Sequence, residues 1–227
     1  MDEITSIYQT HYQEKFMQHG ERPEGVDWGP HPEDLELRIC RVLDVMDEAQ
    51  SPDQPPSILD VGCGYGSALE HLERRGWKTR FTGIDLCAPM IESARRRHPE
   101  HSWITGDIFD IEFPDRFDYV VCNGLPNLKL EASLRTVKDL AKRLVARMFA
   151  LSRIGCSINF MTTNVNFFAS HLFYQNPVEF LGWCMTELTT KVRLDHSYPL
   201  YEFTLCLYRE DAPGRAHGSH RKQPATT

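Results

Sequence analysis

The sequence contains no apolar run of about 18 residues or more, which argues against a membrane-spanning helix. It also lacks an excess of positive charge, because 25 lysine and arginine residues face 32 aspartate and glutamate residues, for a net charge of -7. Proteins that bind nucleic acid through its phosphate backbone are normally basic, so this balance argues against such a partner. The N-terminus, Met1-Asp2-Glu3, lacks the basic and then apolar pattern of a secretory signal. We therefore expect a cytoplasmic protein that binds neither nucleic acid nor membranes.

The sequence also lacks paired cysteine spacings. Its seven cysteines are an odd number without a C-x-x-C pair, and Cys122, Cys156 and Cys206 lie within apolar runs. This usage is typical of small buried hydrophobic residues in a reducing compartment, and it predicts neither a disulfide framework nor a zinc site. No set of carboxylates shows metal-binding spacing either, so we expect no metal.

The length of 227 residues is enough for one α/β domain and too short for two ordinary ones. We expect residues 1–50 to form an N-terminal helical cap on a main domain of residues 51–210. The tail, 211–227, lacks apolar periodicity and is expected to be disordered.

A glycine-rich stretch, Ser57–Leu69, is the central motif of the sequence. Its apolar run and glycine cluster predict a buried strand, a tight turn and the start of a helix. Gly62, Gly64 and Gly66 permit a positive φ and a close approach of a ligand to the main chain. The free N–H groups of the helix that follows favour a carboxylate or phosphate. By itself, the motif indicates a nucleotide-like cofactor.

Two aspartates sharpen this interpretation. Asp60 precedes the glycine turn, and Asp85 closes the next predicted strand, where it can accept hydrogen bonds from both ribose hydroxyls. Together with the glycines, they resemble the D/E-x-G-x-G-x-G hallmark and strand-two acid of the class I S-adenosylmethionine-dependent methyltransferases. The resemblance spans residues 57–209. It implies the cofactor S-adenosylmethionine, with product S-adenosylhomocysteine, whose methionine part lies on the glycine turn and whose ribose lies on Asp85.

The resemblance also implies the fold. We expect an α/β, Rossmann-like class I methyltransferase fold, with a seven-stranded, mostly parallel sheet, an antiparallel last strand, helices on both faces and an N-terminal helical lid. The apolar patterns predict further strands at 79–85, 102–105, 117–122, 157–162, 191–195 and 201–208, and helices at 34–46, 67–75, 88–98, 131–153 and 178–188. In the family an acid such as Asp107 binds the adenine amino group, and an apolar neighbour such as Ile108 covers the ring. The expected cofactor-binding residues are Asp60, Gly62, Cys63, Gly64, Gly66, Asp85, Leu86, Gly106, Asp107, Ile108, Asn123, Gly124 and Trp28.

The segment Asn123-Gly124-Leu125-Pro126 follows a predicted strand at the ligand-binding edge of the sheet. Nucleobase amino-methyltransferases carry [D/N]-P-P-[Y/F] there to hold a flipped base. This chain has one proline, out of register, and no following aromatic, which argues against base methylation.

Three regions are candidates for the acceptor site. The helical stripe with Tyr8 and Tyr12, and the loop that carries Trp28, predict either a lid over the cleft or ordinary packing. The insertion at 164–176 predicts either substrate contacts or a surface loop. The candidate substrate-binding residues are Tyr8, Tyr12, Trp28, Asn127, Asn164, Asn166 and Tyr174, and the candidate catalytic residues are His196, His171 and Tyr8.

Three functions remain open on this basis. The first is methyl transfer by in-line displacement to a nitrogen or oxygen of a small molecule, such as a secondary metabolite or sugar, in natural product biosynthesis. Two segments, Gly25–Trp28 and Tyr198–Thr204, resemble a subgroup of small bacterial methyltransferases of secondary or polysaccharide metabolism. The second is a protein or RNA methyltransferase. The third is a regulator that binds S-adenosylmethionine without turnover. We expect a monomer or homodimer.

Overall fold

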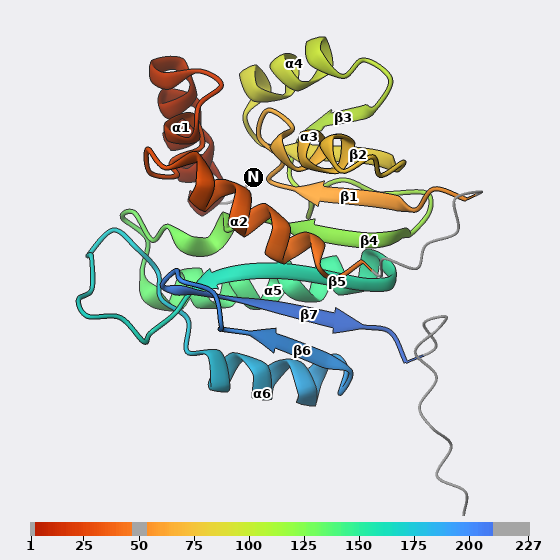
Figure 1. Cartoon of the computed structure of the whole chain (residues 1–227). Coiled ribbons are helices and arrows are strands. Elements are labelled where there is room, and N and C mark those ends of the chain that lie inside the picture. Colours follow the sequence, from red (N-terminus) through yellow and green to blue (C-terminus); the bar gives the residue numbers. More distant parts are fainter. Residues whose placement is uncertain (1–2, 47–53, 211–227) are drawn as a thin grey trace, which may run out of the picture.

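Residues 3–46 and 54–210 are described by a computed structural model of the chain (Figure 1). The predicted boundary between residues 50 and 51, and the predicted disordered tail 211–227, lie outside these described residues. Within them, no helix is long and apolar enough to cross a membrane.

A seven-stranded sheet forms the centre of the molecule, with strand order β3-β2-β1-β4-β5-β7-β6. All neighbouring strands pair in parallel except β7, which runs antiparallel to β5 and β6. The fold predicted from the glycine motif is therefore confirmed. The strands are β1 (Ser57–Val61), β2 (Arg80–Asp85), β3 (Ser102–Thr105), β4 (Phe117–Cys122), β5 (Ser152–Met161), β6 (Val192–Asp195) and β7 (Glu202–Tyr208).

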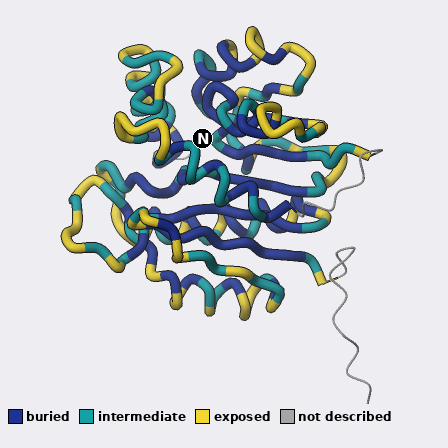
Figure 2. Tube along the Cα trace, viewed as in Figure 1, coloured by how far each residue is buried: buried dark blue, intermediate teal, exposed yellow. Residues whose placement is uncertain are grey.

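Helices cover both faces of this sheet, because its strands are apolar on both sides. Ile58 packs into a core with α2, α3 and α4, whereas its neighbour Leu59 packs into a second core with α1, α5 and α6. Figure 2 shows the strands as the buried interior. The helices are α1 (Glu3–His19), α2 (Pro32–Leu43), α3 (Ser67–Arg74), α4 (Ala88–Arg97), α5 (Leu134–Leu151) and α6 (Pro177–Glu187), with two short 3-10 helices, η1 (Pro23–Val26) and η2 (Leu125–Asn127).

The boundary between α5 and β5 differs from the prediction. The helix was expected to continue to residue 153 and the strand to begin at 157, but α5 ends at Leu151 and β5 begins at Ser152. Ser152 is extended, with ψ of 144°, and its hydroxyl donates to the Phe149 carbonyl at 2.9 Å. Gly155 then pairs with Tyr119 of β4 and with Tyr208 of β7. Because β5 pairs with β4 on one edge and with β7 on the other, it begins earlier than the local apolar pattern indicates.

The strand order places the carboxyl ends of β1, β2 and β4 at one edge of the sheet. The order reverses between β1 and β4, and such a switch point is where open α/β sheets bind ligands. In Figure 1 α1 lies beside this edge, next to α4. The first helix thus covers the place where the sequence motif predicts the cofactor.

Candidate active site

A cleft opens at this edge and encloses about 690 Å3 of space, including open solvent at its mouth. Eleven of the predicted site residues line it, among them the glycines of the turn and the acid that ends β2. They are Tyr8, Tyr12, Trp28, Gly62, Gly64, Asp85, Leu86, Gly106, Asp107, Ile108 and Asn123.

The glycine turn forms part of the lining of this cleft. Gly62 and Gly64 have φ values of 72° and 55°, which disfavour other residues. A Cβ added at Gly62 would lie 3.0 Å from a methyl group of Leu125, and one at Gly64 would lie 3.0 Å from a methyl group of Val26. Both the backbone conformation and the close packing against these two side chains therefore favour glycine at the turn.

Asp85 ties the turn to the end of β2. Its Oδ2 accepts the Gly64 N–H at 2.9 Å, and its Oδ1 accepts the Cys87 N–H at 2.8 Å. Burial raises the pKa of the Asp85 carboxyl, and these backbone hydrogen bonds oppose the rise. A carboxylate has about four lone-pair sites, so two accepted bonds leave capacity for two ligand hydroxyls.

Asp60 lies beneath the turn and does not line the cleft. It is 3% exposed, and burial together with the nearby Asp85 charge raises its pKa to about 7. The Asp60 carboxyl is therefore a buried group whose ionisation depends on the charge of Asp85.

The first helix covers one end of the cleft. The Thr5 hydroxyl donates to Asp107 Oδ2 at 3.1 Å, and the Phe109 N–H donates to Asp107 Oδ1 at 2.9 Å. The Gln9 side-chain amide donates to the Leu86 carbonyl at 3.2 Å. Asp107, which was predicted to bind adenine, and Leu86 are therefore also contacts of α1, so α1 covers this end.

An aromatic wall with few polar groups forms the other end of the cleft. The Trp28 ring lies so close to Gly124 that a Cβ there would overlap it. On the ring, the Arg38 guanidinium lies 4.3 Å from the centroid, and Arg38 Nε donates to the buried Glu202 at 2.7 Å. The ion pair with Glu202 therefore holds the Arg38 guanidinium in place over the Trp28 ring.

Tyr12 and Asn123 are two further polar side chains that line the cleft. Burial raises the pKa of the Tyr12 phenol well above its usual value, so it stays protonated and can donate a hydrogen bond. The Asn123 side-chain oxygen is buried without a hydrogen-bond partner among the described residues. It is therefore an acceptor available to a bound ligand.

Tyr8 has a structural role in addition to lining the cleft. It is 2% exposed, and its hydroxyl donates to the Leu128 carbonyl at 2.5 Å. Burial raises its pKa, which keeps the hydroxyl protonated. The ring faces the cleft while the hydroxyl anchors α1.

The two candidate histidines do not line the cleft. His171 is exposed, and its backbone carbonyl accepts the N–H groups of Lys129 and Leu130 at 2.8 and 3.1 Å. His196 is exposed beside the ring of Phe203, with ring centroids 6.3 Å apart. The fold brings neither imidazole to the cofactor motif.

The predicted contacts from the 164–176 insertion also lie outside the lining. Asn164 and Asn166 are exposed, and the Asn166 amide donates to the Tyr201 hydroxyl at 2.7 Å. The Tyr174 hydroxyl accepts the Ala169 N–H at 3.0 Å within the same loop. The fold therefore brings none of these three side chains into the cleft lining.

Four other predicted residues support the cleft from behind. Gly66, with φ of 99°, makes room for Trp103, since an added Cβ would lie 2.9 Å from its ring. The Asn127 side-chain oxygen accepts the Met161 N–H at 3.0 Å. Cys63 is buried, and Gly124 contacts Trp28 as described.

The residues that line the cleft and were not predicted are apolar: Val26, Val61, Ile84, Met90 and Leu125. Their only sequence signal is their position next to the motif residues.

Comparisons with known proteins agree with this architecture. A family profile described as a methyltransferase domain matches residues 58–146. A protein of Mycobacterium tuberculosis (strain ATCC 25618 / H37Rv), whose name assigns it provisionally to the methyltransferases, is 33% identical over 154 residues. The match covers 66% of this chain and 92% of that protein. The chain therefore belongs to the class I S-adenosylmethionine-dependent methyltransferases, and the cofactor is S-adenosylmethionine, as predicted.

Two further relatives carry specific names. The dTDP-4-amino-2,3,4,6-tetradeoxy-D-glucose N,N-dimethyltransferase of Saccharopolyspora spinosa is 35% identical over 129 residues, 56% of this chain and 45% of that one. A solved structure of phosphoethanolamine N-methyltransferase 1 from Haemonchus contortus, with phosphoethanolamine and S-adenosylhomocysteine, matches with a TM-score of 0.62 at 14% identity. It aligns with 94% of this chain and 50% of that one, so this chain spans about half of both proteins.

Proposed function

We propose that this protein transfers the methyl group of S-adenosylmethionine to a nitrogen or oxygen of a small molecule. The observation that carries the proposal is one cleft with two chemically different ends. One end holds Gly62, Gly64, Asp85 and Asp107, the residues of the cofactor motif, and the other holds the aromatic wall with Trp28.

The residues that line the cleft support this cofactor. The glycine turn would hold the methionine part, Asp85 has acceptor capacity for the ribose hydroxyls, and Asp107 with Ile108, which line the same cleft, would hold adenine. The bound cofactor supplies a methyl group already activated on a sulfonium. The task of the protein is therefore to hold the acceptor in line with that methyl and to exclude water.

Two polar groups of the cleft lining, Asn123 and Tyr12, suit a small amine or hydroxyl. The Asn123 oxygen can accept an N–H or O–H of the acceptor and so orient its lone pair. Tyr12 stays protonated and is therefore a donor rather than a base. An amine that arrives neutral needs no base before transfer, whereas a hydroxyl does, so this lining favours nitrogen as the methylated atom.

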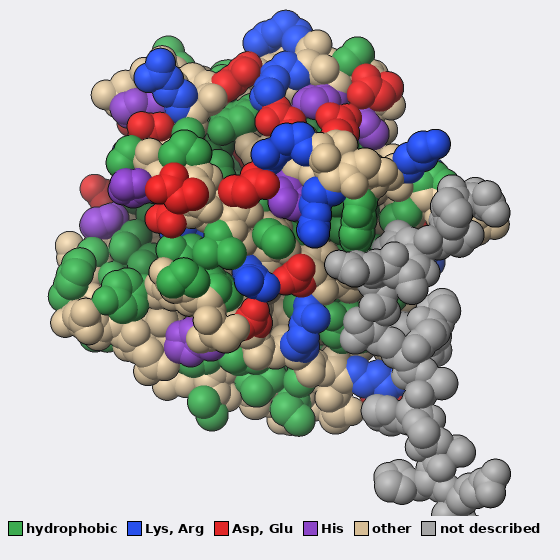
Figure 3. Space-filling view, in the orientation of Figure 1, with side chains coloured by type: hydrophobic (Ala, Val, Ile, Leu, Met, Phe, Trp, Pro, Cys, Tyr) green, Lys and Arg blue, Asp and Glu red, His purple; other side chains and the backbone are tan. Residues whose placement is uncertain are grey.

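Two observations favour a small molecule over a macromolecule. The names of the Saccharopolyspora and Haemonchus proteins specify an amino sugar and phosphoethanolamine as their substrates. On the face drawn in Figure 3, lysine and arginine side chains alternate with acidic ones and form no continuous basic surface among the described residues. A nucleic-acid acceptor normally requires such a surface.

The test is transfer of labelled methyl from S-adenosylmethionine into a lysate of the source organism, followed by separation into small-molecule and macromolecular fractions. We expect label in the small-molecule fraction, lost with Asp85→Ala and retained with His196→Gln, whose side chain is exposed outside the cleft. Label in protein or RNA would instead support a macromolecular acceptor. Tight cofactor binding without label in either fraction would support a regulator that binds without turnover.

A further inference from the structure

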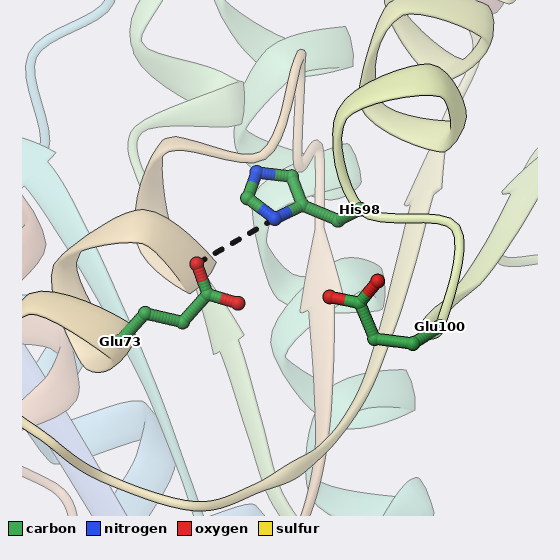
Figure 4. A group of neighbouring side chains, drawn as sticks. All are labelled: Glu73, His98 and Glu100. Atoms are coloured by element: carbon green, nitrogen blue, oxygen red, sulfur yellow. Dashed lines mark ion pairs between the residues drawn. The ribbon is translucent and has the colours of Figure 1, made fainter.

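A cluster of histidine and glutamate side chains lies away from the cleft, where α3 ends and α4 turns into β3. Glu73 comes from the last turn of α3, and His98, Glu100 and His101 come from the H-P-E-H turn after α4. Figure 4 shows Glu73, His98 and Glu100 converging on one space. In Figure 3 histidine and acidic side chains sit side by side over this end of the two helices. The glycine turn that opens α3 into the cleft lies at the other end of that helix.

The distances within the cluster suit a small metal ion. His98 Nδ1 lies 3.5 Å from Glu73 Oε2, and His101 Nε2 lies 3.8 Å from Glu73 Oε1 and 3.6 Å from Glu100 Oε1. These separations exceed the roughly 2.7–3.2 Å of good N–H···O hydrogen bonds. Neighbouring ligands around tetrahedral zinc, at about 2.0–2.2 Å from the metal, are about 3.3–3.6 Å apart. Ligand atoms of Glu73, His98 and Glu100 all lie within 4.8 Å of one another.

The His98 side chain is buried, and its ring does not use all of its hydrogen-bonding capacity. It is only 9% exposed, its carbonyl accepts the Trp103 indole N–H at 2.8 Å, and its Nε2 is buried without a hydrogen-bond partner among the described residues. Glu70 Oε1 lies 3.7 Å from that Nε2 and forms an ion pair with Arg97. In metal sites the second ring nitrogen of a ligating histidine commonly faces a carboxylate, which fixes the tautomer. Glu70 is in place for that role.

We propose that Glu73, His98 and Glu100 bind one Zn2+ ion, with His101 beside it. Two carboxylates balance its charge, and the neutral imidazole of His98 supplies the nitrogen ligand that zinc accepts and that magnesium and calcium avoid. The ion joins the end of α3 to the turn before β3, so its role is structural. The sequence analysis predicted no metal, because Glu73 is distant in the sequence from the H-P-E-H turn and only the fold brings them together.

The test uses the full-length protein, stripped of metal with a chelator and titrated with Zn2+ in a calorimeter. We expect one ion per chain and, with Co2+ in its place, the visible absorption of a tetrahedral centre. His98→Gln is expected to weaken Zn2+ binding by more than about 100-fold, since loss of an outer carboxylate alone costs roughly 10–100-fold. Glu70→Gln is expected to fall within that smaller range.

The matched control is His31→Gln. His31 forms an exposed contact of 3.4 Å with Glu33 and belongs to no metal-ligand group among the described residues, so its loss should leave Zn2+ binding unchanged. If His98→Gln fails to fold, Glu100→Gln replaces it, because that side chain is 60% exposed and its change is mild. Absence of stoichiometric binding, or equal affinity in the Glu100→Gln and His31→Gln variants, would overturn the proposal.

Discussion

Asp60→Asn is expected to make the protein more stable at neutral and basic pH. The Asp60 carboxyl is 3% exposed, and its pKa is raised from 3.8 to about 7 by burial and by the Asp85 charge. A rise of about three pKa units disfavours the ionised form by about 4 kcal/mol at 1.36 kcal/mol per unit. An asparagine of the same shape carries no charge and avoids this cost.

The direction of the Asp60 pKa shift determines how the unfolding free energy changes with pH. Between the unfolded pKa of 3.8 and the folded pKa of about 7, the folded protein binds a proton on Asp60 that the unfolded chain has lost. Stability from this group is therefore greatest at low pH and falls as the pH rises through that window. From about pH 5 to about pH 8, the native protein should lose about 2.5 kcal/mol relative to the Asp60→Asn variant.

Urea unfolding of both proteins without cofactor, followed by tryptophan fluorescence at several pH values, measures this difference. Other titrating groups are common to both proteins, so their contributions cancel to first order. If the two stability curves stay parallel from about pH 5 to about pH 8, the Asp60 carboxyl is not the buried, proton-binding group described here.

Three further substitutions test the cleft. Asp85→Ala is expected to weaken S-adenosylmethionine binding by about 1.5–3 kcal/mol, roughly 10–150-fold, through loss of two ribose hydrogen bonds. Unchanged affinity by calorimetry would contradict the ribose assignment. Trp28→Ala should cost more transition-state free energy, calculated from kcat/KM, than unfolding free energy, because the Trp28 ring forms a wall of the cleft. Equal losses in the two free energies would mean that Trp28 only packs against its neighbours. Tyr8→Phe should instead lower the unfolding free energy by about 1–3 kcal/mol with little change in turnover, because the Leu128 carbonyl loses its donor. A turnover defect without loss of stability would assign the hydroxyl to catalysis.

The cofactor end of the cleft could be predicted because its chemistry is local. Gly62 and Gly64 require positive φ within one strand-turn-helix unit, and Asp85 ends the next strand, which a right-handed crossover places beside that turn. Asp107, which the resemblance to the class I methyltransferases implied, reaches the cleft from the end of β3. Each step needs only strand direction and neighbouring strands.

The other predicted residues show where this reasoning fails. His171, His196 and Tyr174 follow strands on the ligand side of the sheet, but both histidines are exposed and the Tyr174 hydroxyl accepts the Ala169 N–H within its own loop. Gly66 matches the motif, yet its missing side chain makes room for Trp103 behind the cleft. The direction of a loop depends on contacts that no local pattern encodes.

The sequence by itself determined the glycine turn and most of the strands and helices, because these follow from local residue patterns, and the resemblance of its motif to the class I methyltransferases implied the strand order and the cofactor. Only the tertiary structure decided that Tyr8 anchors α1, that Arg38 holds Trp28, and that Glu73 meets the H-P-E-H turn. Those contacts join residues distant in the chain. Their formation depends on the packing of whole helices against the sheet, which no short stretch of sequence specifies.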